Sequence, residues 1–182
     1  MTQSGANPVA LQRPFSVGDG RLYLATATLV LGNVLLPYAV HRIPDGGRIL
    51  LPIFFFTLIA GWRFGAVAGL LTGLLSPLVN HALTGLPPGP ALPSLLVQSA
   101  LLGALAAAVA ARSRKLSLPL LALVVLLHQA LILSPLLLRA GLPPTLAALQ
   151  QRVPGLLLQV LGGFALLRFM GRHLPPNPAP RP

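Results

Sequence analysis

The amino-acid sequence predicts an all-α membrane protein, a bundle of six transmembrane helices with both termini in the cytoplasm. Three observations support this fold class. Of the 182 residues, 54% are hydrophobic and 8% are charged, whereas soluble domains carry about 25% charged residues. The apolar residues gather in six blocks separated by short polar, proline-rich or glycine-rich breaks. The basic residues fall mainly on one side when the blocks are threaded back and forth through a bilayer.

Each apolar block is expected to cross the bilayer once, because a spanning helix needs about 20 residues, within about 17–25. The six blocks run from Leu22 to Val40, Ile49 to Trp62, Phe64 to Leu83, Ala91 to Ala111, Leu116 to Leu138 and Val153 to Met170. The second block is short, about 22 Å long as a helix. It can span if the arginines at its two ends extend to the interfaces, or it can enter the membrane halfway as a hairpin.

Short breaks separate the six blocks. They are His41–Arg48, Arg63, Thr84–Pro90, Arg112–Lys115 and Arg139–Arg152. At one end of the chain, residues 1–20 are polar and punctuated by glycine and proline, and at the other end residues 175–182 are rich in proline, which cannot continue a helix. We therefore expect a disordered cytoplasmic tail at residues 1–20, a six-helix membrane domain at residues 21–174 and a Pro-rich cytoplasmic tail at residues 175–182.

The distribution of basic residues orients the bundle, because cytoplasmic loops carry an excess of Lys and Arg. If both termini lie on one side, that side holds nine basic residues: Arg13, Arg21, Arg63, Arg112, Arg114, Lys115, Arg168, Arg172 and Arg181. The other side holds four: Arg42, Arg48, Arg139 and Arg152. This difference predicts that both termini are cytoplasmic, which an even number of crossings allows.

The sequence contains 13 basic and 2 acidic residues, and the resulting net charge of +11 raises the question of nucleic-acid binding. The basic residues are scattered between the apolar blocks, and only Arg112, Arg114 and Lys115 form a cluster. Orientation in the membrane and attraction to anionic lipid explain this pattern better. We expect the lipid bilayer, and no nucleic acid, as a partner. The sequence has no cysteine, which excludes disulfides and Cys-ligated metals.

Motifs that power transport or catalysis are absent from the sequence. No carboxylate lies within an apolar block, because Asp19 is in the first tail and Asp45 in the first outer loop. Proton- and sodium-coupled carriers commonly rely on intramembrane acids. The sequence also lacks the G-x-x-x-x-G-K-[ST] phosphate loop, the H-E-x-x-H metal motif and the G-x-S-x-G nucleophile motif. We therefore expect neither an enzyme nor a self-powered carrier, and no cofactor or metal site.

Seven polar side chains lie inside the apolar blocks. They are Asn33, Asn80, His81, Gln98, His128, Gln129 and Gln159. His128 lies near the middle of its block, and the other six lie about 3–10 Å toward the outer side of theirs. Buried amides are costly unless paired. One interpretation is an outward-facing pocket that hydrogen-bonds a small polar ligand with a ring. The alternative is that these side chains hydrogen-bond one another and hold the helices together.

The outer loops extend this candidate substrate-binding site. The segment Ile43–Arg48 contains two adjacent glycines and a cation, which suits a lid over a ligand, although an ordinary turn fits equally well. Arg48 therefore joins the predicted binding residues, and it and Arg152, both at the outer rim, would tolerate a carboxylate or phosphate. Amides and histidines suit pyrimidines, pterins, flavins and amide-bearing acids alike, so the ligand cannot be read from these residues.

Four glycines, Gly61, Gly65, Gly69 and Gly73, follow one another at every fourth residue. This spacing places them on one helix face, and small residues on a face let helices approach closely in lipid. The face serves either packing within this chain, the interpretation we favour, or docking of another membrane subunit.

The arrangement of glycine and proline in Gly47–Pro52, Gly61–Gly65, Gly69–Pro77 and Gly85–Pro88, followed by Leu92-Pro93, resembles the substrate-binding S components of energy-coupling factor (ECF) vitamin transporters. The resemblance runs from about Leu22 to Leu174. It implies a multi-pass protein of the prokaryotic plasma (inner) membrane. It further implies a subunit that captures a vitamin or related small-molecule micronutrient at the outer face of an ECF-type ABC importer. Its partners would be an ECF transmembrane coupling subunit and its ATPases.

The first helix departs from this family. S components often carry an alanine-xxx-alanine face there for docking the coupling subunit, and here Thr28 and Gly32 have that spacing, beside Ala25 and Ala27. Thr28 and Gly32 are therefore the docking residues that the resemblance implies. The alternative function is a non-transporting six-span membrane scaffold of the rod-shape-determining type, in which the amides would be structural.

Overall fold

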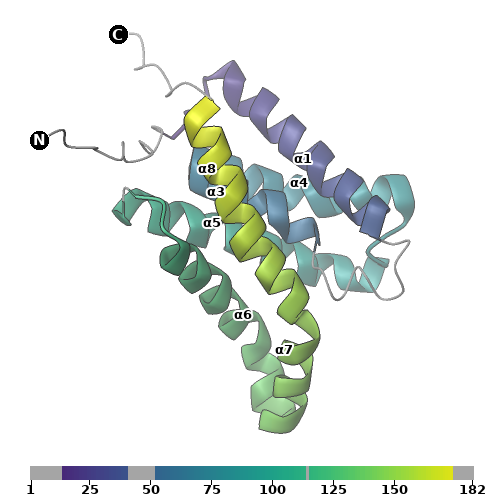
Figure 1. Cartoon of the computed structure of the whole chain (residues 1–182). Coiled ribbons are helices and arrows are strands. Elements are labelled where there is room, and N and C mark those ends of the chain that lie inside the picture. Colours follow the sequence, from purple (N-terminus) through teal and green to yellow (C-terminus); the bar gives the residue numbers. More distant parts are fainter. Residues whose placement is uncertain (1–13, 41–51, 114, 174–182) are drawn as a thin grey trace, which may run out of the picture.

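The computed structural model of the chain describes residues 14–40, 52–113 and 115–173, and the secondary structure of these residues is helical, with no strand among them (Figure 1). The elements, in chain order, are α1 (Gly20–Val40), the 3₁₀ turn η1 (Pro52–Phe54), α3 (Phe55–Phe64), α4 (Ala66–Thr84), the 3₁₀ turn η2 (Gly89–Ala91), α5 (Leu92–Ser113), α6 (Leu118–Ala140), α7 (Leu142–Leu157), the π-helical turn η3 (Leu158–Gly162) and α8 (Gly163–His173). The all-helical prediction is confirmed.

Within the described residues, four helical segments are long and apolar enough to cross a membrane. They are Ala66–Thr84, Gly89–Ser113, Leu118–Ala140 and Leu142–His173. Two further apolar segments, Gly20–Leu36 and Pro52–Phe64, are shorter. Many leucines of these helices are exposed, among them Leu24, Leu83 and Leu138, as expected of side chains that face lipid. The chain thus has the character of a helical membrane protein, while six crossings and cytoplasmic termini stay predictions.

The short second block forms the centre of the bundle. Nine of the ten residues of α3 are buried, and α3 contacts α1, α4, α5 and α8. Figure 1 shows it enclosed among these helices. Since other helices cover α3 on several sides, its apolar side chains are buried by protein rather than by lipid.

The glycine-rich face packs α3 and α4 against α5. A Cβ atom added to Gly69 would lie 2.8 Å from the carbonyl oxygen of Gly103, and one added to Gly73 would lie 2.7 Å from that of Ser99. Gly61 faces the same Gly103 carbonyl. Gly65 has a different role, because its φ of 93° lets the chain turn between α3 and α4. These contacts support packing within the chain. Helix α5 occupies the glycine face, for which docking of a partner subunit was the alternative.

The break predicted at Arg139–Arg152 is largely helical, which corrects the sequence analysis. Helix α6 continues to Ala140, Gly141 turns the chain with a φ of 81°, and α7 begins at Leu142 with proline in its first turn. A glycine at positive φ followed by proline favours the end of one helix and the start of the next. The resulting α6–α7 hairpin extends beyond the ends of the other helices (Figure 1).

The described part of the chain begins at Pro14, within the predicted tail of residues 1–20. Phe15 is buried, its backbone N–H donates to the carbonyl of Phe64 at 3.1 Å, and the two rings stack at 5.2 Å. Near the other end, Met170 accepts a hydrogen bond from Arg63 at 3.3 Å. The start of α1 and the end of α8 therefore lie at the same end of α3. The rest of the predicted tails, residues 1–13 and 174–182, lies outside the described residues.

Candidate functional site

The predicted polar residues divide into two groups with different surroundings. The first is centred on Asn33, which is fully buried on α1. Its Nδ2 donates to the Oγ1 of Thr57 at 3.1 Å and to the Oγ of Ser76 at 2.9 Å, and its Oδ1 accepts from the backbone N–H of Phe56 at 3.0 Å. Asn33 thus joins α1 to α3 and α4.

The Asn33 network continues to a fourth helix. The hydroxyls of Thr57 and Ser99 lie 3.2 Å apart and link α3 to α5, and Ser76 donates to the carbonyl of Thr72 at 2.6 Å. These three hydroxyl residues were not predicted. Thr and Ser mid-helix are too frequent to stand out in a sequence, and only their meeting at one point across helices identifies them. With its partners in place, Asn33 acts as a link between helices.

The second group lies on α6 and α7. His128 and Gln129 are buried on α6, and Arg152 on α7 donates from Nη1 to the Oε1 of Gln129 at 3.2 Å. His128 Nε2 lies 2.9 Å from the carbonyl of Gln98, and the rings of His128 and Phe54 pack edge to face with their centroids 5.4 Å apart. Because a carbonyl only accepts, Nε2 is the donor, which leaves Nδ1 of a neutral ring as an acceptor.

Several buried polar atoms on α6 and on the turn that follows α7 have no hydrogen-bond partner in the part of the chain that the structure describes. They are His128 Nδ1, Gln129 Nε2, Gln159 Nε2 and Gln159 Oε1. Gln159 is fully buried and lies on η3, the π-helical turn between α7 and α8. π-Helical turns occur frequently at functional sites. We call His128, Gln129, Arg152 and Gln159 the α6–α7 cluster.

Gln159 is held beside α6 by the antiparallel packing of the two segments. Arg152 meets Gln129, and further along a Cβ on Gly163 would contact Leu121 at 3.5 Å. Gln159 lies between Arg152 and Gly163 in sequence, so its position falls opposite the stretch of α6 between Gln129 and Leu121. That stretch includes Val124 and Val125, both fully buried.

The remaining binding candidates lie nearer the ends of their helices. Asn80 is buried on α4, and His81 Nδ1 lies 2.7 Å from the carbonyl of Pro87 in the following loop. Gln98 is half-buried and its Nε2 donates to Ser94 at 2.7 Å on the same helix. Arg48 lies outside the described residues, as does the loop that was a candidate lid. His128 and Gln129 therefore contact neighbouring helices, whereas, among the described residues, the side chains of His81 and Gln98 have hydrogen bonds only within their own part of the chain.

Of the two docking residues that the resemblance implies, Thr28 is exposed and Gly32 is enclosed. Thr28 donates to the carbonyl of Leu24 at 2.9 Å and shares an outward stripe of α1 with Leu24, Leu31 and Leu35. A Cβ on Gly32 would come 2.7 Å from the ring of Phe56, so Gly32 packs within the chain.

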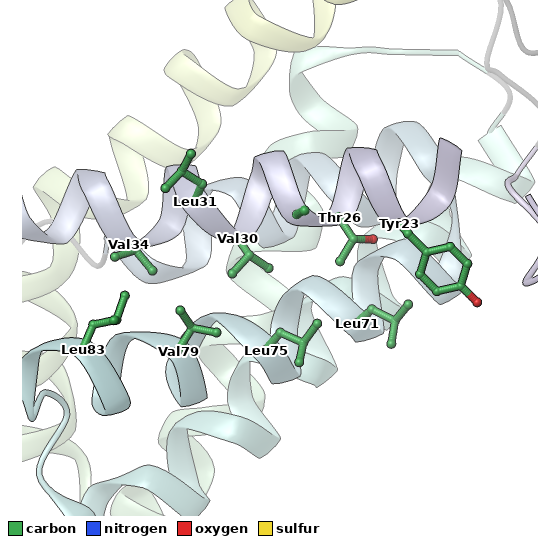
Figure 2. A pocket seen from close by; sticks show the side chains of 10 residues that line it. Tyr23, Thr26, Val30, Leu31, Val34, Leu71, Leu75, Val79 and Leu83 are labelled. Carbon is green, nitrogen blue, oxygen red and sulfur yellow. The ribbon is translucent and has the colours of Figure 1, made fainter. Parts of the chain in front are cut away.

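A groove of about 450 Å³ runs between α1 and α4. Figure 2 shows Val30 and Val34 of α1 facing Leu71, Leu75 and Val79 of α4, with the Tyr23 ring at one end. No predicted binding residue lines this groove. Its hydrocarbon walls suit an apolar occupant, which separates it from the polar α6–α7 cluster.

Arg152 is the residue of the α6–α7 cluster that was not among the predicted binding residues; the sequence analysis placed it at the outer rim, outside any helix. The signal that could have found it is Gly141-Leu142-Pro143, a helix start that brings Arg152 into α7. In the described part of the chain, no group of three His, Asp or Glu residues could hold a metal ion. No protein-family model, curated protein or solved structure matches the chain.

Proposed function

We propose that the chain is the substrate-binding subunit of an ECF-type ABC importer, capturing a vitamin or related micronutrient from the outer side of a prokaryotic plasma membrane. The observation that carries this proposal is the α6–α7 cluster, where four buried side-chain atoms lack hydrogen-bond partners among the described residues. A buried polar atom without a partner costs about 1–3 kcal/mol. A ligand that binds these atoms recovers that free energy, which gives the cost a function.

The cluster suits a small molecule with both donors and acceptors. Gln129 Nε2 and Gln159 Nε2 are donors, while His128 Nδ1 and Gln159 Oε1 are acceptors. The edge contact between Phe54 and His128 brings an aromatic surface to the same place. Vitamins with a ring and several heteroatoms match this combination of polar and apolar groups.

Import by this chain would need a partner that supplies energy. The sequence has no intramembrane acid and no phosphate loop for ATP. In the proposed complex, a coupling subunit docks on the outward stripe of α1, where Thr28 is smaller than the other residues of the stripe, Leu24, Leu31 and Leu35. The proposal includes six crossings with both termini in the cytoplasm. Phe15 and Met170 lie at the same end of α3, which supports an even number of crossings.

The alternative function, a six-span membrane scaffold, is favoured by Asn33. Its side chain has three hydrogen bonds to α3 and α4 and needs no ligand. In a scaffold every buried amide would be used in this way. The unpartnered atoms of Gln159 and Gln129 are the reason to prefer the binding subunit.

The direct test is mass spectrometry of small molecules that co-purify with the protein in mild detergent. We expect one compound in wild type that is reduced in Gln159→Leu. Loss of one hydrogen bond to a buried ligand group weakens affinity by roughly 5- to 150-fold. Thr28→Leu, on the exposed face of α1, is the matched control and should retain the compound. A Gln159→Leu protein that is folded and carries the wild-type amount would contradict the proposed site.

A further inference from the structure

Arg152 lies on the face of α7 that contacts α6. Helix α7 begins at Leu142, so ten rises of about 1.5 Å place Arg152 about 15 Å from the turn at Gly141. The guanidinium contacts Gln129 on the facing helix, and the side chain is half-buried. A half-buried cation is costly when no opposite charge lies beside it, and within membrane helices such a residue commonly marks a site for an ion or substrate.

The chain offers Arg152 little to balance its charge. The sequence contains two acidic residues. Asp19 precedes α1 and accepts from the backbone N–H of Arg21 at 2.9 Å, whereas Asp45 lies outside the described residues. Among the described residues, the hydrogen-bond partner of Arg152 is the neutral Oε1 of Gln129, and no carboxylate lies against it.

We propose that Arg152 binds the anionic group, a carboxylate or phosphate, of a small organic ligand whose remaining polar atoms contact the α6–α7 cluster. This inference rests on the proposed function and adds the charge class of the ligand. Arg is suited to this role because its guanidinium carries five N–H donors on three nitrogens, so that the others can bind an anion while Nη1 contacts Gln129.

A lipid headgroup carries the same anionic chemistry, but the site favours a free ligand. A headgroup would need the guanidinium alone, whereas the α6–α7 cluster also presents unpartnered polar atoms, a donor on Gln129 and both a donor and an acceptor on Gln159. Those atoms fit the ring or amide of a small molecule.

The test uses the full-length protein in nanodiscs of neutral phosphatidylcholine, with thermal unfolding followed at increasing concentrations of three probes. Benzoate and phenyl phosphate carry the two candidate anionic groups, and benzamide is the neutral counterpart of benzoate. Arg152→Gln removes the charge but keeps a hydrogen-bonding amide beside Gln129, and Arg152→Lys keeps the charge. Arg139→Gln, at an exposed arginine of the same hairpin, is the matched control.

We expect benzoate or phenyl phosphate to raise the unfolding temperature of wild type and Arg139→Gln more than benzamide does. Their apparent affinity should fall roughly 10- to 100-fold in Arg152→Gln and be partly restored in Arg152→Lys. Equal stabilisation by benzoate and benzamide in wild type would overturn the inference, and this comparison needs no variant. Stabilisation that appears only when phosphatidylglycerol is added would also overturn it, by assigning Arg152 to a headgroup.

The assignment of an anionic ligand group to Arg152 can fail independently of the proposed function. If the co-purifying compound is neutral and binds Arg152→Gln as well as wild type, the charge assignment fails while the binding subunit stands. If the probes fail and no compound co-purifies, both fail.

Discussion

Asn33 and Gln159 are both fully buried amides within apolar helices, and they differ in what they contact. Asn33 has hydrogen bonds to three other residues, whereas neither side-chain polar atom of Gln159 has a partner among the described residues. The first arrangement stabilises the bundle, and the second costs stability until a ligand binds. Sequence position alone does not separate the two, since both amides occupy the interior of an apolar block.

Asn33→Leu should lower the stability of the protein by about 1–3 kcal/mol. The change removes three hydrogen bonds, and hydrogen bonds between membrane helices contribute about 0.6 kcal/mol on average and up to about 1.7. Thermal unfolding in detergent measures the effect. Gln159→Leu is the matched control, because replacing an unpartnered amide with an apolar group of similar size is nearly neutral or stabilising. Similar losses in both variants would show that Gln159 is also a structural link.

At the scale of the helices, α4 and α5 pack with their backbones in close contact. Gly69 and Gly103 allow α4 and α5 to meet without side chains between them. The four-residue spacing predicted a small-residue face. The spacing could not say whether this face packs against a partner subunit or within the chain. That depends on the position of α5, which is set by contacts between residues far apart in sequence, such as Gly69 and Gly103.

Gly69→Leu should prevent normal folding, because a Cβ there would lie 2.8 Å from the carbonyl of Gly103. Overpacking of this kind costs about 1–3 kcal/mol and sometimes more. Gly89→Leu is the control, since nothing lies within 4 Å of a Cβ at Gly89. The yield of monodisperse protein after detergent extraction is the measurement. Wild-type yield from Gly69→Leu would show that the close approach of α4 and α5 is not essential.

The boundaries of most helices could be predicted from the apolar blocks, and two errors have a common cause. The break at Arg139–Arg152 is largely helical because Gly141 alone turns the chain, and the polar residues after it lie on an exposed helix. Pro14–Asp19 is not part of a disordered tail, because Phe15 stacks on Phe64. In both cases polarity suggested a loop or a tail, while a specific turn or contact determined the structure.

The topology of the whole molecule is accessible to labelling because the sequence contains no cysteine. Single cysteines at Thr2, Gly89 and Asn177 can be treated with a membrane-impermeant maleimide in intact cells. We expect labelling at Gly89 from outside and at the other two only after permeabilisation, as nine basic residues against four predict. Labelling of Asn177 in intact cells would contradict both the six crossings and the outward orientation of the candidate site.

At the scale of the whole molecule, the proposed subunit binds a ligand but does not transport it against a concentration gradient without a partner. The most direct measurement is reconstitution of the purified protein into liposomes with the co-purifying compound, radiolabelled, under an imposed proton or sodium gradient. We expect saturable binding that Gln159→Leu weakens, with no accumulation in the lumen under either gradient. Concentrative uptake driven by an ion gradient alone would contradict a binding subunit that depends on a partner for energy.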